Sequence, residues 1–308
     1  MLNTPVVFVI FNRPDTTSQV FECIRKARPS QLLIIADGPR ADRPREDESC
    51  AATRKIVEQV DWPCEVMHEY SDINLGCRKR LASGLNWVFS MVEDAIVLED
   101  DCLPHPTFFR FCEEMLERYR HDERIAHISG VNFQFGQRRT AQSYYFSRYT
   151  HIWGWASWRR AWQHYDPDMN TWPSVRDGKW LRDMLGDQRL VDYWSKIFER
   201  VYDGDIDTWD YQWLLACWLQ NGLSIIPAEN LVTNIGFGVD STHTTENNPT
   251  ANIPSKELAF PLCSPPFIIR DVVADIASEK LYLPPPRYVR RYRRMKRNLL
   301  NLFAFFGK

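Results

Sequence analysis

The sequence has no long apolar run, no paired cysteine motif and no strong net charge, and each absence excludes a class of protein. Its first apolar run, residues 6–11, is too short for a membrane span or a signal peptide, and no basic segment precedes it. The eight cysteines form no C-x-x-C pair and show no regular spacing. This argues against a zinc or disulfide framework and favours a reducing compartment, so we expect a cytoplasmic protein.

The charge that is present is unevenly divided along the chain. The 308 residues carry a formal net charge of −2, which gives no general attraction for nucleic acid. Residues 287–308 hold eight basic residues and no acidic one, which leaves 30 basic against 40 acidic residues in the rest of the chain. A basic segment on an acidic body is typical of a protein with an anionic partner for that segment alone.

Apolar runs alternate with amphipathic stretches over the first part of the chain. The runs predict strands at 6–11, 32–36, 64–68, 95–98 and 125–129, and the stretches between them predict helices. This alternation predicts an α/β fold with a mostly parallel sheet covered by helices on both faces. After about residue 135 the pattern changes to aromatic segments, which hold many of the 12 tryptophans.

Three consecutive acids, Glu99, Asp100 and Asp101, follow the fourth predicted strand. In an open α/β sheet the ligand binds off the carboxyl ends of the strands. Carboxylates this close repel one another unless a cation lies between them, and Mg²⁺ or Mn²⁺ is often held by one or two carboxylates plus substrate phosphates. The alternative is that the acids cap a helix beginning at Pro104–Thr107, but three acids exceed that need. We therefore predict a divalent-metal site.

Other polar residues fall at the same predicted edge. Arg13 follows the first strand and Asp37 the second. Each alone is typical of a surface residue or a turn, but their shared edge with the acids favours a ligand that carries phosphate, such as a nucleotide diphosphate. Arg78, Lys79 and Arg80 begin a predicted helix, where cations oppose the helix dipole, so they serve a nearby anion or reach solvent.

Two later motifs have both a structural and a functional interpretation. Asp207 is predicted as the N-cap of an apolar helix with Asp210 at its third position, and either acid is also a candidate general base. In "WGWASWRRAW", Trp155, Trp158 and Trp162 recur at helical spacing. This spacing predicts a core-facing helix stripe rather than a surface for stacking sugars.

Together these motifs resemble GT-A-fold glycosyltransferases. The nearest pattern is the N-acetylglucosaminyltransferase that initiates complex N-glycans, with similar bacterial sugar transferases. The likeness covers about residues 5–245 and includes "VIFNRP", "IIADGP", "VLEDDCLPHPTFF", "WGWASW", "TWDYQW" and "NLVTNIGFG". The E-D-D followed by P-x-F-F is the most specific of these motifs, and the others gain weight from their order along the chain.

The resemblance implies donor-site roles for matched residues. Arg13 is similar to the arginine that contacts the donor diphosphate, and Asp37 to the acid that hydrogen-bonds uracil. Of the DxD-like acids, Asp101 would bind Mn²⁺ or Mg²⁺, and Asp100 would contact ribose or phosphate. Arg78 and Glu99 are assigned further contacts with the nucleotide-sugar donor, and His243 is assigned a contact with the metal.

The resemblance also implies a catalytic base and a biological role. Asp210 matches the position of the base, but Tyr211 follows it where the family has a second acid, so Asp207 remains a rival. We predict a metal-dependent inverting hexosyl- or N-acetylhexosaminyl-transferase that moves a sugar, most simply from a UDP-linked donor, to a glycan or glycolipid hydroxyl. Polysaccharide biosynthesis is the expected setting.

The expected organisation has three parts. Residues 1–135 form the nucleotide-sugar-binding half and residues 136–262 the acceptor-side, catalytic half of one domain. Residues 263–308 form a proline-rich linker and a basic amphipathic tail, expected to be helical and to dock peripherally on an anionic membrane surface.

Two other functions remain open at this point. A nucleotidyltransferase that makes sugar nucleotides carries a glycine-rich loop after its first strand, which "FNRPDTT" lacks. A non-catalytic glycan-binding protein with a relic nucleotide pocket is the other alternative.

Overall fold

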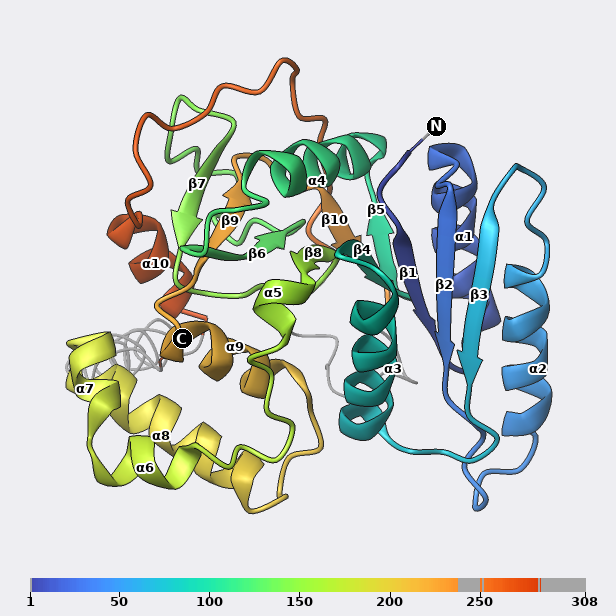
Figure 1. The fold of residues 1–308 in the computed structure, drawn as a ribbon, viewed down its shortest axis with the longest axis horizontal. Coiled ribbons are helices and arrows are strands. Elements are labelled where there is room, and N and C mark those ends of the chain that lie inside the picture. Colours follow the sequence, from blue (N-terminus) through green and yellow to red (C-terminus); the bar gives the residue numbers. More distant parts are fainter. Residues whose placement is uncertain (1, 238–249, 251, 282, 284–308) are drawn as a thin grey trace, which may run out of the picture.

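The computed structural model describes residues 2–237, 250, 252–281 and 283, which form an eight-stranded sheet with helices on both faces (Figure 1). The strand order is β3-β2-β1-β4-β8-β6-β9-β7. Four of the seven pairings, β3–β2, β2–β1, β1–β4 and β6–β9, are parallel. This mostly parallel, Rossmann-like α/β architecture confirms the predicted fold class.

The strands and helices have the following bounds. The strands are β1 Val6–Ile10, β2 Gln31–Ala36, β3 Glu65–Tyr70, β4 Asp94–Glu99, β5 Cys102–Pro104, β6 Ile125–Ser129, β7 Tyr144–Ser147, β8 Trp155–Trp158, β9 Leu223–Pro227 and β10 Val232–Asn234. The helices are α1 Pro14–Ala27, α2 Glu46–Val57, α3 Cys77–Met91, α4 Pro106–Arg118, α5 Arg159–Trp162, α6 Trp172–Asp177, α7 Trp180–Leu185, α8 Gln188–Tyr202, α9 Asp210–Leu219 and α10 Val272–Glu279.

The strands β1, β2 and β4 are buried on both faces because alternate side chains meet different helices. In β1, Phe8 packs into the core shared with α1 and α4, whereas Val7 packs against α3 from the other side. Continuous apolar runs in the sequence are therefore the expected signal for these strands. The predicted strands at 6–11, 32–36, 64–68, 95–98 and 125–129 are confirmed to within a few residues.

The tryptophan motif forms a strand where the sequence predicted a helix. Trp155–Trp158 is β8, which lies antiparallel to both β4 and β6. Side chains three residues apart on a strand point to opposite faces, so Trp155 and Trp158 enter different cores. Trp162 lies on the short helix α5 and packs against Trp155 at a ring separation of 6.2 Å. All three are buried, so the core role is confirmed and the continuous helix was wrong.

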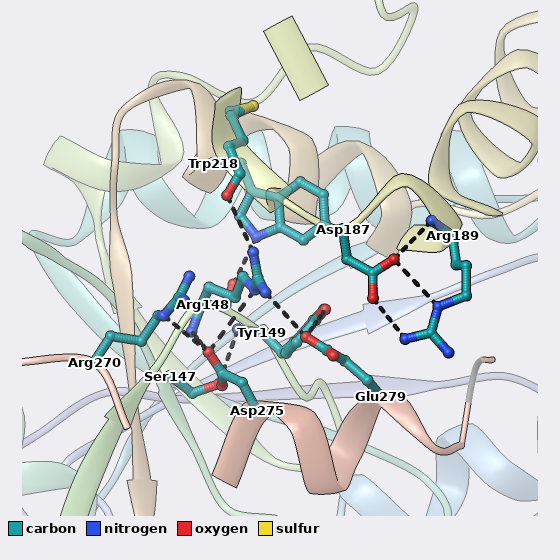
Figure 2. Close-up of polar contacts among 10 residues, drawn as sticks. Ser147, Arg148, Tyr149, Asp187, Arg189, Trp218, Arg270, Asp275 and Glu279 are labelled. Atoms are coloured by element: carbon teal, nitrogen blue, oxygen red, sulfur yellow. Dashed lines mark hydrogen bonds and ion pairs between the residues drawn. The ribbon is translucent and has the colours of Figure 1, made fainter. Parts of the chain in front are cut away.

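A balanced ion cluster fixes α10 on the rest of the molecule (Figure 2). Arg148 donates to the Glu279 carboxylate at 3.0 Å and lies 3.8 Å from Asp275. Asp275 also accepts the Ser147 hydroxyl at 2.5 Å and pairs with Arg270 at 3.3 Å. Burial raises the pKa of Asp275 to about 6, against the lowering effect of these partners. The cluster adds to a small apolar contact, in which Ala274 of α10 packs with Tyr145 and Ile226.

Two sequence predictions cannot be compared with this structure. The predicted C-terminal helix and basic tail, residues 284–308, lie outside the described residues, as does His243. Within the described ranges, every helix is too short or too polar to cross a bilayer.

Candidate active site

A cavity of about 880 Å³ opens at the carboxyl ends of β1, β2 and β4. Parallel strands bring their carboxyl ends to one edge, and here the side chains beyond those ends line a single space. The predicted site residues in its lining are Arg13, Asp37, Glu99, Asp100, Asp101, Asp207 and Asp210. Arg78 is not in the lining, and His243 lies outside the described residues.

Arg13 lies between two of the three consecutive acids. Its guanidinium forms ion pairs with Asp100 and, at 2.9 Å, with Asp101. The backbone N–H of Phe11, at the end of β1, donates to Asp100 at 3.2 Å. One guanidinium thus pairs with two of the three carboxylates that follow β4, and the cluster keeps an excess of negative charge.

The surplus of carboxylates also shifts the pKa values of the groups in the cluster. Burial raises the pKa of Glu99, and the neighbouring Asp101 and Asp100 charges add to this effect. Burial likewise raises the pKa of Asp100, although Arg13 opposes the shift. Burial tends to lower the pKa of Arg13, but Asp100 and Asp101 outweigh it and raise the pKa. A further cation at this edge would relieve the remaining repulsion.

The donor set fits a divalent metal only in part. No described residue hydrogen-bonds the Glu99 carboxylate, and Asp101 Oδ1 contacts only the Cys102 thiol, at 3.6 Å. Both groups offer the hard oxygen ligands that Mg²⁺ and Mn²⁺ prefer. Among the described residues no three His, Cys, Asp or Glu side chains converge as a metal site. The protein therefore fits a metal that takes most of its ligands from water and substrate phosphate.

The acids do not cap the helix that follows them. His105 is the N-cap of α4, and its ring accepts the Thr107 backbone N–H at 3.2 Å. Between the acids and α4 the chain forms β5, which pairs with β10. The alternative interpretation of the acid cluster as a helix cap is therefore wrong.

Asp37 lines the cavity, but its carboxylate oxygens are already hydrogen-bonded by the protein. Its oxygens accept backbone N–H groups from Gly38 and Leu75 at 2.9 Å and from Gly76 at 3.1 Å, and the Asn74 side chain at 3.0 Å. These bonds hold the loop between β3 and α3 against the end of β2. A donor base bound here would meet this loop, and the hydrogen bond from Asp37 to uracil stays a prediction.

The two candidate bases lie in different local settings. The helix α9 begins at Asp210 with Trp209 as N-cap, so the predicted capping role of Asp207 was wrong. Asp207 Oδ1 instead accepts the Arg78 backbone N–H at 3.3 Å, at the start of α3. Asp210 accepts the Thr208 hydroxyl, and its charge contributes to the raised pKa of Glu99 across the cavity.

One wall of the cavity is aromatic. It comes from residues between 133 and 211 and contains Phe133, Tyr149, His151, Trp153, Trp194 and Tyr211. The rings of Phe133 and Trp153 meet edge to face at 5.4 Å, and those of Trp194 and Tyr211 at 5.9 Å. Burial lowers the pKa of His151 to about 3, so this imidazole is neutral at pH 7. The wall is apolar and uncharged.

Three further cavity residues were not among the predicted site residues. Arg80, rather than Arg78, reaches the cavity, and it is buried in an ion pair with Glu69. The Cys77 thiol lies among Glu99, Asp210, Asp207 and Asp37, and burial together with these charges raises its pKa.

The third of these residues is Gly236, which lies against the Arg13–Asp101 pair. A Cβ added at this glycine would meet Asp101 Oδ2 at 2.2 Å and Arg13 Nη1 at 2.9 Å. Only the sequence "NIGFG" signalled this close approach, through its glycines.

Comparisons with known proteins give only partial matches. No protein-family model and no curated protein sequence matches the chain. Solved structures similar in part include mannosyltransferase PcManGT from Pyrobaculum calidifontis in complex with GDP-Man and Mn²⁺ (15% identity, TM-score 0.39), matched over 55% of this chain and 49% of that one. The chain thus spans about half the length of that enzyme.

Two other solved structures overlap the fold. Galactosyltransferase LgtC, in complex with donor and acceptor sugar analogs, matches at 10% identity and a TM-score of 0.38, over 72% of this chain and 73% of that one. UDP-glucose pyrophosphorylase, complexed with UDP-glucose, matches at 11% identity and a TM-score of 0.28, over 47% of this chain and 62% of that one. Glycosyltransferases and a nucleotidyltransferase are therefore both among the partial fold neighbours.

Proposed function

We propose that this protein is a metal-dependent, inverting glycosyltransferase that uses a nucleotide-diphosphate sugar. The observation that carries the proposal is the unbalanced acid cluster at the cavity edge, where Arg13 faces Glu99, Asp100 and Asp101. Buried charges that serve only the fold are paired. A cluster left with excess negative charge at a cavity suits a ligand that arrives with a divalent cation.

The donor diphosphate would bind beside Arg13. Its guanidinium has donors in a fixed planar arrangement that match phosphate oxygens as well as carboxylates. Asp101 and Glu99 would hold Mn²⁺ or Mg²⁺ together with the diphosphate, and the metal would supply charge neutralisation for the leaving group. Gly236 leaves room for phosphate oxygens because a side chain there would fill the space at the Arg13–Asp101 pair.

Asp210 is our choice for the general base. It lies on the cavity at the start of α9, where it would accept the proton of an acceptor hydroxyl as that oxygen bonds to the anomeric carbon. The bond from the anomeric carbon to the diphosphate oxygen breaks on the opposite face, which inverts the configuration. Asp207 is the rival, but its contact with the α3 backbone already gives it a structural role.

The aromatic wall is our candidate for the acceptor side. Aromatic faces stack on the apolar faces of sugar rings, and the wall lines the same cavity as the acids. We infer a glycan or lipid-linked acceptor, and a hexosyl or N-acetylhexosaminyl donor, most simply UDP-linked. The basic tail, with eight Lys and Arg residues from 287 onward, would hold the enzyme at an anionic membrane surface on the cytoplasmic side.

A thermal-shift screen of nucleotide sugars tests the proposal. With Mn²⁺ present, a true donor at 100 times its Kd stabilises the protein by about 2.7 kcal/mol. We expect this stabilisation from UDP-sugars with Mn²⁺, a much smaller one with EDTA, and none in Asp101→Asn. The exposed Glu117→Gln is the matched control and should behave as the native protein, because Glu117 pairs only with Arg120 on α4's outer side.

Donor hydrolysis and product analysis separate the alternatives. A glycosyltransferase releases UDP from its donor slowly in water and faster with an acceptor, whereas a nucleotidyltransferase releases pyrophosphate from UTP and a sugar phosphate. Stabilisation by glycans alone, with no response to any nucleotide sugar, would leave the non-catalytic binding protein as the better interpretation. Equal stabilisation with and without metal would refute the metal requirement.

A further inference from the structure

The helix α10 carries its polar side chains inward and its apolar side chains outward. Asp275 and Glu279 are 1% and 6% exposed and pair with Arg148 beneath the helix (Figure 2). On the opposite face Val273 is 62% exposed and Ile276 50%. A surface helix of a soluble protein normally shows the reverse arrangement. The ion cluster fixes this orientation, because rotating the helix would leave Arg148 buried without partners.

The outward face continues into the preceding segment. Phe267 and Ile269 are 71% and 69% exposed, just before the N-cap Asp271. Five of the eleven exposed large hydrophobic residues of the described chain fall in this short stretch, namely Phe267, Ile269, Val272, Val273 and Ile276. We call these five residues the α10 patch. Contiguous exposed apolar residues of this kind mark interaction surfaces.

Two cations lie near the α10 patch. Lys280 is exposed directly after the helix, whereas Arg270, beside Ile269, directs its guanidinium inward to Asp275. Arg139 is linked to α10 through Gln134, which accepts from Arg139 and donates to the Ala274 carbonyl at 3.0 Å. The acids of α10 itself are turned inward. In the sequence, eight basic residues and no acid follow from residue 287 onward.

The end of this segment lies at the candidate active site. After α10 the chain reaches Leu281, which lines the cavity, and Leu283, which packs against the core formed by α8 and α9. Tyr149 lines the same cavity and donates to Glu279 at 3.0 Å. A surface bound by the α10 patch would therefore lie close to the cavity, by way of the short segment 280–283.

We propose that the α10 patch is a docking surface for an anionic lipid bilayer, with its apolar side chains inserted at the interface and its flanking cations on lipid headgroups. Apolar side chains rimmed by Lys and Arg are the combination that binds such interfaces. A second copy of the chain is the less suitable occupant, because a symmetric dimer would bring the cations near the two patches together. Resting on the proposed function, the acceptor would be a lipid-linked sugar presented at the bilayer.

Vesicle sedimentation of the full-length protein tests this docking. We compare vesicles of phosphatidylcholine with vesicles of equal parts phosphatidylcholine and phosphatidylglycerol, at low and high salt and without any nucleotide sugar. The native protein should bind the anionic vesicles and lose binding at high salt, because salt screens the contribution of the cations. Because no sugar donor is present, this result does not depend on the proposed catalytic function.

Charged substitutions then locate the contact. Val273→Glu combined with Ile276→Glu should lower the partition coefficient on anionic vesicles by at least about tenfold, which corresponds to about 1.4 kcal/mol. Ile269→Glu, outside the helix, should lower it in the same direction and guards against helix-specific misfolding. The matched control is Met91→Glu, since Met91 is 52% exposed at the end of α3, far along the chain from the patch. This control should bind as the native protein does.

Three outcomes would overturn the docking surface. The first is no binding of the native chain to anionic vesicles, and the second is unchanged binding in both patch variants. The third is a large drop in melting temperature, or a change from dimer to monomer in analytical ultracentrifugation, caused by the patch variants but not by Met91→Glu. That result would mean that the chain itself, or a second copy, covers the patch. Retained donor hydrolysis in the patch variants would show that a loss of lipid binding is separate from catalysis.

Discussion

Two arginine clusters in this protein have similar chemistry and opposite environments. Arg13 pairs with Asp100 and Asp101 at the edge of the cavity, with Glu99 beside them. Arg148 pairs with Asp275 and Glu279 beneath α10, where Arg270, Ser147 and Tyr149 complete the cluster (Figure 2). The first cluster has three carboxylates for one guanidinium, whereas the second has two carboxylates for two guanidinium groups.

We interpret the difference as one between an ion cluster that supports the fold and one that we propose serves a ligand. A cluster whose buried charges balance one another holds two elements together and needs no further ion. An unbalanced cluster at a cavity keeps a repulsion that a bound cation would relieve, and folding alone gives no reason for it. Charge balance and access to a cavity therefore carry more information about function than the number of ion pairs.

The strongest test of this comparison is to remove the central arginine of the balanced cluster. Arg148→Met leaves Glu279 and Asp275 buried with one guanidinium fewer, and breaking a buried pair costs about 3–5 kcal/mol. Because Arg270 still pairs with Asp275, we expect a loss near the lower end of that range. Urea unfolding at neutral pH measures it.

The exposed pair Asp187–Arg189, drawn in the same view, is the control for Arg148→Met (Figure 2). Arg189→Met should cost less than about 1 kcal/mol, because exposed ion pairs contribute little and Asp187 keeps its capping bond to the Arg189 backbone N–H. Similar losses in the two variants would mean that the Arg148 cluster does not hold α10 in place.

The next largest effect is expected at Asp210, whose charge acts on the unbalanced cluster. Asp210→Asn should leave donor affinity nearly unchanged and lower kcat by ~10²–10⁴, the usual contribution of a general base. Asp207→Asn should lower kcat less, because its carboxylate contacts the start of α3. Single-turnover kinetics with a saturating donor makes the measurement. A larger loss in Asp207→Asn would reverse the assignment of the base.

A smaller effect is expected in the pH dependence of the balanced cluster. Burial raises the pKa of Asp275 from 3.8 to about 6. Between these values the folded state binds more protons than the unfolded chain, so this carboxyl makes the free energy of unfolding fall as pH rises, by at most about 1.4 kcal/mol per pH unit. Above about pH 6 its contribution is constant.

The measurement is the unfolding free energy of the native protein minus that of Asp275→Asn, followed across that pH window. This difference should fall as pH rises. The difference is needed because the buried histidines His127 and His151, whose pKa values burial lowers to about 4 and about 3, act in the opposite direction. They cost stability as pH falls below their ordinary value of 6.5. A difference that rises with pH between about pH 4 and 6 would contradict the raised pKa.

The strands in the first part of the chain were predictable because their apolar runs agreed with the tertiary structure. The runs at 6–11 and 95–98 are apolar on both faces and have helices on both sides, so their short length and polar flanks identify β1 and β4. In "WGWASW" the same tryptophans suit a helix or a strand. These residues form a strand because they pair with β4 and β6. The spacing of the tryptophans in the sequence does not show that pairing.

The sequence predicted which strand ends form the candidate site. It did not predict the contacts that the side chains make there. Strand order brings Arg13 to the acids, since β1 and β4 are neighbours in the sheet. The contact between Asp207 and α3 joins residues 129 positions apart, and nothing local in the sequence signals it. For the same reason the full engagement of Asp37 by the loop at 74–76 could not be foreseen.

The smallest expected change in stability, and the sharpest contrast with Arg148→Met, comes from removing one charge of the unbalanced cluster. Asp101→Asn keeps an oxygen that can accept from Arg13, so the contact seen at 2.9 Å can persist. It also removes a charge that raises the pKa of both Glu99 and Asp100. Without donor or metal, we expect the melting temperature to stay the same or rise by up to about 2 °C.

Differential scanning calorimetry of Asp101→Asn, with and without Mn²⁺ and a UDP-sugar, makes this last test. The native protein should be stabilised by the ligands and the variant should not, although the variant alone melts at least as high. A clear drop in melting temperature without ligand would mean that the Arg13 cluster supports the fold as the Arg148 cluster does. In that case charge imbalance would not distinguish the two clusters, because the acid lost from the cavity would be one that the folded state needs.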